Sequence, residues 1–380
     1  MVFEHYIYKS QKKLRCGYTT GTCAALAAKA ATMKLLGGET AERISIMTPK
    51  GIPVETEVVD LAWEEDFAQC AVRKDSGDDP DVTNGMLVYA RVSRIGGRAI
   101  EIDGGTGVGR VTRRGLDQPV GAAAINRVPR QMIAHEVEEL RGQYGYEGGI
   151  RVVISVPGGE ETARKTFNPR LGIEGGISIL GTSGIVEPMS EQALTESIRL
   201  ELSRLKAEGS SAAVIAPGNY GEEYLRKKLA GLEPVTVKCS NFIGETLDHA
   251  VVLGFEKLLL VGHIGKFIKL AGGIMNTHSR IADARLELMT VHAVLAGADS
   301  GTVRELMNCA TTDEGLEILE RQGIMEQTMN SLMAKIGFHI RQRVGEQVWI
   351  EAIMFSNERG VLGVTDGADK LAKTLLEAML

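Results

Sequence analysis

The strongest constraint on the fold is a strand–loop–helix pattern that repeats through the second half of the chain. Short apolar runs such as 212–216 and 258–261 each lead into a glycine-containing loop, and helix-like segments follow most of these loops. Such alternation is typical of a parallel sheet with right-handed crossovers, whose loops meet at the carboxyl ends of the strands. The pattern predicts a Rossmann-like parallel α/β domain with a ligand crevice at that edge.

The first part of the chain has a different rhythm. Alternating apolar residues and turn signals predict antiparallel strands, including a pair formed by 87–95 and 98–103, and helices follow near 20–36 and 129–144. A chain of 380 residues also exceeds the usual size of one core. We therefore expect an α+β domain over residues 1–148 and an α/β domain over residues 149–380, with the place of 341–380 left open.

Composition excludes several classes of protein. The net charge is −6 and aromatic residues make up 5%, without a Lys/Arg block, so nucleic acid is a poor ligand. The five cysteines form no CxxC pair, and no two histidines have zinc-ligand spacing, so we expect neither a disulfide framework nor a bound metal. No apolar run reaches membrane-spanning length, and the start lacks a signal-peptide core. We expect a cytoplasmic protein without membrane contact.

The loops after the predicted strands are the best candidates for a binding site. Glycine lets a ligand approach the backbone, and N–H groups at helix starts favour anions. The simpler interpretation is that the glycines only turn the chain. None of the loops matches GxGxxG, which disfavours a nicotinamide or flavin dinucleotide. The loops in question are 181–184, 218–221, 240–244 and 262–265.

Two further loops carry charge. The stretch 104–110 is glycine-rich, and Arg110 and Arg113 place cations beside it, which suits a carboxylate; a hairpin turn with a solvated basic face explains it equally well. The acidic stretch 74–85 lacks EF-hand spacing. It is either a solvated turn or a cap that orders a binding loop.

One histidine stands near a carboxylate at the start of a predicted helix over about 279–296. His278 and Asp283 are candidates for a proton-accepting pair, because a carboxylate can orient an imidazole. His292 instead shares an apolar helical stripe with Leu288 and Leu295, which indicates a packed structural residue.

Taken together, the motifs resemble one family. They include CGYTTGTCAALAAKAA (16–31), KDSGDDPDVTNG (74–85), GGTGVGRVTRRGL (104–116), NPRLGIEGGISILGTSGIVEPMS (168–190), PGNYG (217–221), SNFIGE (240–245) and LLLVGHIGKFIKLAGGIMNTHSRIADARLE (258–287). These blocks resemble the signature of the cobalt-precorrin-5B C1-methyltransferases of anaerobic cobalamin biosynthesis, the CbiD family. The chain departs from that pattern at Arg114 and Arg127, where the family usually has proline.

The resemblance implies methyl transfer from S-adenosylmethionine to C1 of cobalt-precorrin-5B, giving cobalt-precorrin-6A. The tetrapyrrole would be the partner, and the cobalt would belong to the substrate. Association into a homo-oligomer and transient contact with other enzymes of the pathway stay open. Two other functions also stay open, a non-catalytic protein that binds or channels a corrinoid intermediate and a nicotinamide-dependent reductase.

The resemblance, together with the loop pattern, gives the expected site residues. The catalytic candidates are His278 and Asp283. The residues expected to bind S-adenosylmethionine are Gly181, Thr182, Ser183, Gly184, Glu187, Gly218, Asn219, Tyr220, Asn241, Glu245, Gly262 and His263. The residues expected to bind the substrate are Thr19, Thr20, Gly21, Thr22, Asp75, Asp78, Asp79, Thr83, Arg110, Arg113, Ser279 and Arg280.

Overall fold

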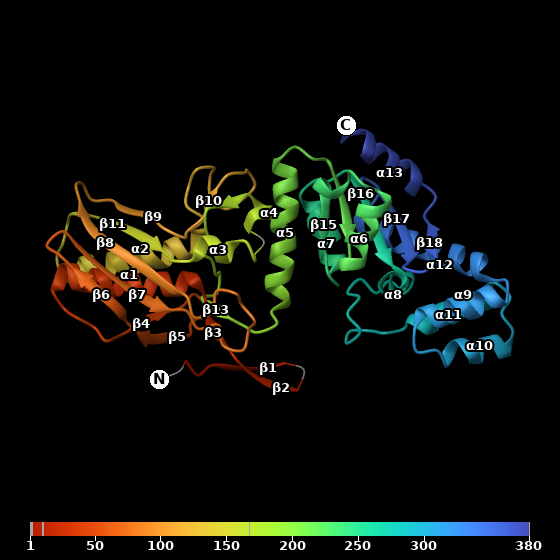
Figure 1. Ribbon diagram of the computed structural model, residues 1–380, viewed down its shortest axis with the longest axis horizontal. Coiled ribbons are helices and arrows are strands. Elements are labelled where there is room, and N and C mark those ends of the chain that lie inside the picture. Colours follow the sequence, from red (N-terminus) through yellow and green to blue (C-terminus); the bar gives the residue numbers. More distant parts are fainter. Residues whose placement is uncertain (1–2, 10, 167, 380) are drawn as a thin grey trace. The chain divides into compact units, whose positions relative to one another are not determined.

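A computed structural model describes residues 3–9, 11–166 and 168–379 and shows a mixed α/β protein. The chain forms two compact units, Met1–Glu191 and Gln192–Leu380 (Figure 1). The boundary therefore lies at 191–192 and not at the predicted 148–149. The reason is that strand β11 (Gly149–Ser155), which we expected to open the second domain, pairs on both sides with strands of the first unit.

The first unit is built on a five-stranded sheet in the order β6-β7-β8-β11-β9. β11 pairs antiparallel with β8 and parallel with β9, so the predicted direct pairing of β8 with β9 is wrong. Ile150, Val152 and Ile154 of β11 are fully buried, and this apolar face explains its central place in the sheet. The other strands are β6 (Val59–Trp63), β7 (Phe67–Arg73), β8 (Leu87–Ile95) and β9 (Ile100–Gly104).

Two helices pack on this sheet, as the sequence predicts. Helix α1 (Thr20–Gly37) contacts β7 and β8, and α2 (Arg127–Gln143) lies against α1 and β9. The Thr19 side chain accepts a hydrogen bond from Thr22 N and caps α1, while Gly38 ends the helix in the left-handed conformation. The alanine-rich side of α1 is fully buried, which allows the close approach to α2.

Short elements complete the first unit. Residues 177–180, which precede the 181–184 loop, form single bridges with the first unit, Ile177 to Val108 and Ile179 to Ile125, so this loop belongs to that unit. The short elements are β1 (Tyr6–Lys9) with β2 (Lys12–Arg15), β3 (Gly17–Tyr18) with β13 (Ile185–Val186), β4 (Arg43–Met47) with β5 (Pro53–Glu57), β10 (Arg110–Val111) with β12 (Ile173–Glu174), α3 (Gly159–Ala163) and α4 (Asn168–Leu171).

The second unit contains a five-stranded sheet in the order β15-β14-β16-β17-β18. All neighbours are parallel except β18, which is antiparallel to β17. The three inner strands, β14, β16 and β17, are almost continuously buried, as expected for a parallel sheet covered on both faces. They are β14 (Ala212–Ala216), β15 (Thr236–Lys238), β16 (Lys257–His263), β17 (Trp349–Ser356) and β18 (Gly360–Val364).

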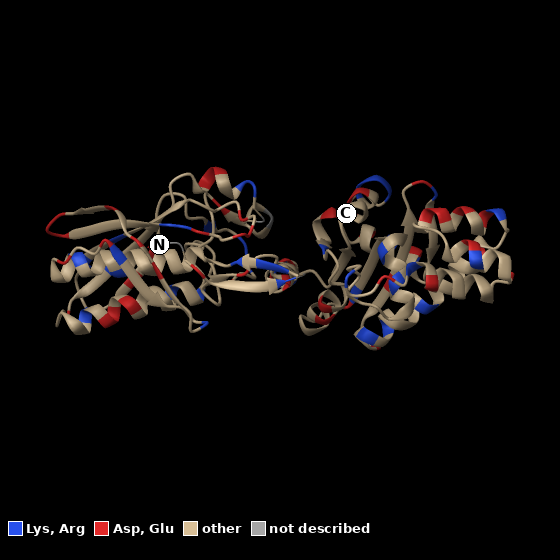
Figure 2. Cartoon of the chain, turned by 90° about the horizontal axis from the view of Figure 1, so that it is seen from below, with Lys and Arg blue, Asp and Glu red and all other residues tan. Residues whose placement is uncertain are grey.

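Helices surround this sheet, and residues 341–380 join it through β17, β18 and the last helix. The helix expected from 279 begins at Arg285, because residues 278–284 form a loop. Acidic and basic residues are intermixed over each unit (Figure 2). The helices are α5 (Glu191–Ala207), α6 (Asn219–Lys228), α7 (Ile243–Val252), α8 (Ile264–Phe267), α9 (Arg285–Leu295), α10 (Ser300–Met307), α11 (Thr312–Arg321), α12 (Met325–Val344) and α13 (Ala368–Glu377), with 3₁₀ turns at Glu233–Val235 and Ile268–Gly272.

Candidate functional site

The carboxyl edge of the second sheet has the geometry of a binding crevice. From β14 the chain crosses to β15 on one side, and it then returns to place β16 on the other side of β14. Ligands of open α/β sheets bind at such a reversal of strand order, outside the carboxyl ends of the strands. Three of the loops selected from the sequence, after β14, β15 and β16, therefore share this edge.

Aromatic rings line the edge near β16. The imidazole of His263 lies 5.3 Å from the ring of Tyr220 and 5.7 Å from the ring of Phe355, measured between centroids. Gly265 N donates to His263 Nδ1 over 3.2 Å, so the imidazole caps α8. Burial lowers the pKa of His263 below its ordinary value, which favours the neutral ring. His263 is thus a neutral, oriented group beside an exposed tyrosine.

A lysine that we did not select from the sequence lies where the three loops converge. Lys266 Nζ donates to the carbonyl oxygen of Ser240 over 3.3 Å, and a Cβ built on Gly218 would lie 3.3 Å from the same nitrogen. Burial lowers the pKa of Lys266. The run GHIGK contained this signal, because a lysine that closes a glycine loop after a strand is placed to meet an anion.

The 275–282 loop borders the same edge. Thr277 N donates to the carbonyl oxygen of Asn241 over 2.9 Å, and Phe242 forms a bridge with Asn276. The buried Lys269 fixes the loop from beneath, since its Nζ donates to Thr277 O over 3.2 Å and to Ala282 O over 2.8 Å. The exposed Ser279 and Arg280 are thus carried on an ordered loop.

The other predicted residues of this edge have defined partners. Asn219 Oδ1 accepts a hydrogen bond from Lys238, which also lies 3.1 Å from Glu222. Glu245 stands half-exposed in the first turn of α7. It follows Asn241 by four residues in the chain.

The predicted pairing of His278 with Asp283 is wrong. Both carboxylate oxygens of Asp283 accept hydrogen bonds from Arg285, and the Arg285 guanidinium holds the pKa of Asp283 below its usual range. His278 Nδ1 instead accepts a hydrogen bond from Arg280 N over 3.1 Å. In the neutral ring the proton then lies on Nε2, so this nitrogen donates and does not accept. The turn that carries His278 separates it from the helix, and this breaks the helical spacing assumed from the sequence.

Gly262 has a packing role, and its expected contact with the cofactor stays a prediction. A Cβ at this position would lie 2.1 Å from a ring carbon of Phe267, which is fully buried beneath the loop. The glycine is therefore needed for core packing.

We expect Gly262→Ala to lower the free energy of unfolding by about 2 kcal/mol, because overpacking a filled core forces side chains from their rotamers. Chemical denaturation measures the change. Gly265→Ala is the control, since its Cβ would meet its nearest neighbour at 3.4 Å, an ordinary contact. Equal stability of the two variants would contradict the structural role.

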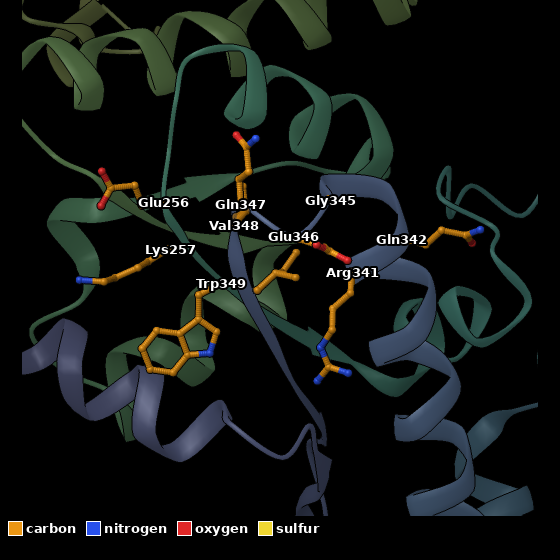
Figure 3. Close-up of a pocket in the computed structure, with 10 residues that line it drawn as sticks. Glu256, Lys257, Arg341, Gln342, Gly345, Glu346, Gln347, Val348 and Trp349 are labelled. Carbon is orange, nitrogen blue, oxygen red and sulfur yellow. The ribbon is translucent and has the colours of Figure 1, made fainter.

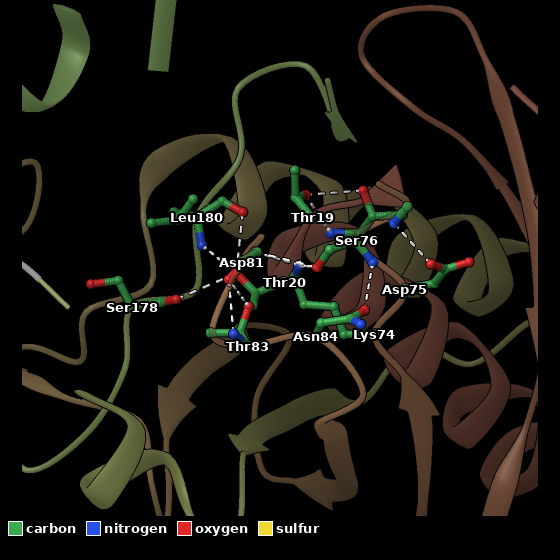
Figure 4. A network of polar contacts seen from close by, with 12 residues as sticks. Thr19, Thr20, Lys74, Asp75, Ser76, Asp81, Thr83, Asn84, Ser178 and Leu180 are labelled. Carbon is green, nitrogen blue, oxygen red and sulfur yellow. Dashed lines mark hydrogen bonds and ion pairs between the residues drawn. The ribbon is translucent and has the colours of Figure 1, made fainter. Parts of the chain in front are cut away.

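Most of the remaining predicted residues form a second cluster, inside the first unit (Figure 4). Thr22 Oγ1 donates to Gly184 O over 2.7 Å, and Leu180 N donates to Thr20 Oγ1 over 2.9 Å. Gly21 N donates to Leu180 O, so the 181–184 loop is bound to the start of α1. A Cβ on Gly181 would lie 2.3 Å from Thr19 Oγ1. Gly181, Thr182, Ser183 and Gly184 thus lie beside the predicted substrate residues Thr19–Thr22, within the first unit.

The acidic loop belongs to the same cluster and is internally paired. Lys74 is almost fully buried, and its Nζ lies 2.6 Å from Ser76 Oγ and 2.7 Å from Asp81 Oδ2. Asp75 forms a two-point pair with Arg15, and Tyr18 N donates to Asp75 O over 2.9 Å. The loop is therefore an ordered platform and not a solvated turn.

Single contacts tie the segment after the 181–184 loop to this platform. Asp79 Oδ1 accepts from Met189 N over 3.2 Å, and Glu187 pairs with Lys50. Asp78 Oδ2 accepts from Arg15 N over 2.7 Å, and Thr83 is buried against Asp81. These side chains hold backbone in place.

The basic pair from the 104–116 stretch has partners elsewhere in this unit. Arg110 forms a two-point ion pair with Asp103 at 2.7 and 3.0 Å. Arg113 packs beside Gly172, where an added Cβ would lie 2.4 Å from its side chain. The described hydrogen bonds of Arg110 do not connect it to the Thr19–Asp81 cluster.

Comparison with known proteins decides the family. Residues 7–188 match the CbiD family model, and residues 276–366 match the model of the CbiD C-terminal domain. The chain is 48% identical over 354 residues to a protein of Ruminiclostridium cellulolyticum named cobalt-precorrin-5B C(1)-methyltransferase, covering 93% of this chain and 92% of that one. The chain belongs to the CbiD family.

Other relatives within the family agree. A protein of the same name from Thermoanaerobacter is 48% identical and covers 94% of this chain and 97% of its own. A crystal structure of a cobalamin biosynthesis protein (CbiD) from Archaeoglobus fulgidus is 33% identical, covers 74% of this chain and 87% of its own, and has a TM-score of 0.41. The first family match lies wholly within the first unit and the second within the second unit.

The CbiD-family chain also has a cavity of about 710 Å³ at the opposite edge of the second sheet (Figure 3). Its lining includes Lys257 and Trp349, the first residues of β16 and β17, so it lies at the amino ends of the strands. Arg341 from α12 and Glu346 complete its polar side. The cavity is separate from the carboxyl edge, where the predicted site residues converge.

Two further properties concern only the described part of this family member. No group of three or more His, Cys, Asp or Glu side chains there is arranged to hold a metal ion. Within the same residues, none of the helices combines the length and the apolar character that a membrane crossing requires.

Proposed function

We propose that this chain is a methyltransferase of cobalamin biosynthesis that transfers a methyl group to C1 of cobalt-precorrin-5B. The observation that carries the proposal is the 48% identity to a protein of that name over 93% of this chain. A second relative of the same name, from Alkaliphilus metalliredigens, is 45% identical and covers 98% of both chains. The similarity to proteins of that name therefore extends through both units.

We propose that S-adenosylmethionine binds at the carboxyl edge of β14, β15 and β16. When bound, it supplies an electrophilic methyl group and leaves as S-adenosylhomocysteine. The edge suits such a ligand because Gly218 leaves bare backbone, and α6 and α7 start without a side-chain cap. The residues assigned to this site are Gly218, Asn219, Tyr220, Asn241, Glu245 and His263.

Each assigned group has a specific part. The Glu245 carboxylate suits the ribose hydroxyls as an acceptor, and the exposed Tyr220 ring beside the neutral His263 offers a flat, weakly polar surface for a base. Gly181–Gly184 and Glu187 are left out of this site, because they pack on α1 and Lys50 in the first unit.

We propose that the substrate's carboxylates are bound by exposed donors on ordered loops. Arg280 and Ser279 are exposed on the loop that Lys269 fixes, and Nε2 of His278 is a donor in the neutral ring. Separately, within the first unit, the platform of Thr19–Thr22 and Asp75–Asp81 orders the loop that carries the exposed Thr182. Positioning the reactants in this way can supply ~7–11 kcal/mol of barrier lowering without an enzyme nucleophile.

Calorimetric titration tests the proposed function. Purified protein is titrated with S-adenosylmethionine, alone and in the presence of a corrinoid polycarboxylate. We expect micromolar binding of S-adenosylmethionine that the corrinoid strengthens, because two adjoining ligands favour one another. Binding of the corrinoid without any binding of S-adenosylmethionine would contradict the methyltransferase and support a carrier.

A further inference from the structure

Lys266 differs from the lysines around it in having no acidic partner. Lys238 pairs with Glu222, and Lys269 donates to two carbonyl oxygens and lies 3.9 Å from Asp283. The described partner of Lys266 is the neutral carbonyl oxygen of Ser240. Among the described residues, no carboxylate forms an ion pair with this ammonium.

This arrangement is costly for the folded protein. Burial of an ammonium disfavours its charged form, and here it lowers the pKa of Lys266, with the charges of Lys238 and Lys269 acting in the same direction. A carboxylate within reach would offset this cost, and none among the described residues pairs with Lys266. The missing partner is therefore expected from outside the chain.

The position of the ammonium indicates where that partner binds. Its nitrogen is 3.3 Å from the Cβ position of Gly218, so it faces the bare backbone at the end of β14. Lys266 itself follows β16, three residues after His263. The charge thus lies at the reversal of strand order, at the edge assigned above to S-adenosylmethionine.

We propose that the Lys266 ammonium binds a carboxylate of a reactant at the carboxyl edge of β14 and β16. The inference rests on the proposed function and adds to it the position at which this carboxylate binds. The carboxylate comes either from the methionine part of S-adenosylmethionine or from an acetate or propionate group of the tetrapyrrole. Both sources offer the same charge-assisted hydrogen bond.

Lys266→Met, which keeps the length of the stem, tests the subsite. In one arm, S-adenosylhomocysteine is compared with 5′-methylthioadenosine, which lacks the amino-acid carboxylate. In the other arm, a corrinoid polycarboxylate is compared with its full methyl ester. Lys266→Arg restores the charge, and Lys227→Met is the control, because Lys227 is an exposed residue of α6 paired with Glu223.

We expect Lys266→Met to weaken binding of the charged member of one pair by at least about tenfold and to leave its neutral counterpart unchanged. Loss for S-adenosylhomocysteine identifies the methyl donor as the source, and loss for the corrinoid acid identifies the substrate. Lys266→Arg should recover much of the affinity. The melting temperature of Lys266→Met should not fall, because a charge without a partner is removed.

Three results would overturn the inference. If wild-type protein binds the ligands and Lys266→Met binds all of them as well as Lys227→Met does, the subsite is wrong while the proposed function stands. If wild-type protein binds none of the ligands, the proposed function fails together with the subsite. A fall in melting temperature with unchanged affinities would make Lys266 structural and would also overturn it.

Discussion

Asp81→Asn is expected to lower the free energy of unfolding by about 3 kcal/mol, since it leaves the Lys74 ammonium buried without its counter-charge. Lys74 is 2% exposed at its side chain, and Asp81 Oδ2 lies 2.7 Å from its Nζ. Denaturation with urea measures the loss. Because the loop of Lys74 and Asp81 supports the start of β3 and α1, we also expect faster proteolysis of the first unit.

The matched control is Glu147→Gln, which removes one charge of an exposed pair. Arg98 and Glu147 are 79% and 81% exposed at their side chains, so we expect a change below about 1 kcal/mol. Similar losses for Asp81→Asn and Glu147→Gln would contradict the structural role of the buried pair.

The contribution of Asp81 to the free energy of unfolding should also depend on pH in a defined direction. Burial alone would raise the pKa of Asp81, but the charge and hydrogen bond of Lys74 outweigh it and hold the pKa below its ordinary value. A lowered folded-state pKa stabilises the protein above the unfolded pKa of about 4, and this contribution is lost as the pH falls through the folded value. The difference in free energy of unfolding between wild type and Asp81→Asn should therefore shrink in acid and stay constant near neutrality.

Gly218→Ala is expected to weaken S-adenosylmethionine binding by about a hundredfold, equivalent to about 2.8 kcal/mol. Gly218 has φ +82° and ψ −175°, a conformation that a side chain disfavours, and the new methyl group would lie 3.3 Å from Lys266 Nζ. The methyl group would thus cover the bare backbone and shift the ammonium. Isothermal titration measures the affinity.

Gly231→Ala separates ligand binding from backbone strain. Gly231 has φ +105° and follows α6, and its Cβ would meet only Leu376, at 3.4 Å. We expect Gly231→Ala to lower the free energy of unfolding about as much as Gly218→Ala does, with unchanged affinity for S-adenosylmethionine. If Gly218→Ala bound S-adenosylmethionine as tightly as the wild type, the assignment of the methyl-donor site to the carboxyl edge would be wrong.

The sequence predicted the type of most elements but not the boundary between the units. Periodicity located α1, α2 and the apolar runs of β14 and β16, because each has a clear buried face. It misassigned β11, since a short, largely apolar strand looks the same in a parallel sheet as between β8 and β9. Pairing partners far apart in the chain decide this, and one sequence does not contain them.

The candidate site was predicted in the same partial way. The loops after β14, β15 and β16 do meet, because parallel strands bring their carboxyl ends together. The expectation failed for His278 and Asp283, since the loop before α9 is longer than the helical spacing assumed. Lys266 was missed because its importance comes from the absence of a paired carboxylate nearby, and this is a property of the three-dimensional surroundings.

The most direct test of the account is methyl transfer itself. Purified protein is incubated anaerobically with cobalt-precorrin-5B and S-adenosylmethionine carrying an isotopically labelled methyl group, and the corrinoid is analysed by mass spectrometry and NMR. The account predicts one labelled methyl group on C1 and an equal amount of S-adenosylhomocysteine. Recovery of unlabelled corrinoid from a protein that binds both reactants would contradict it.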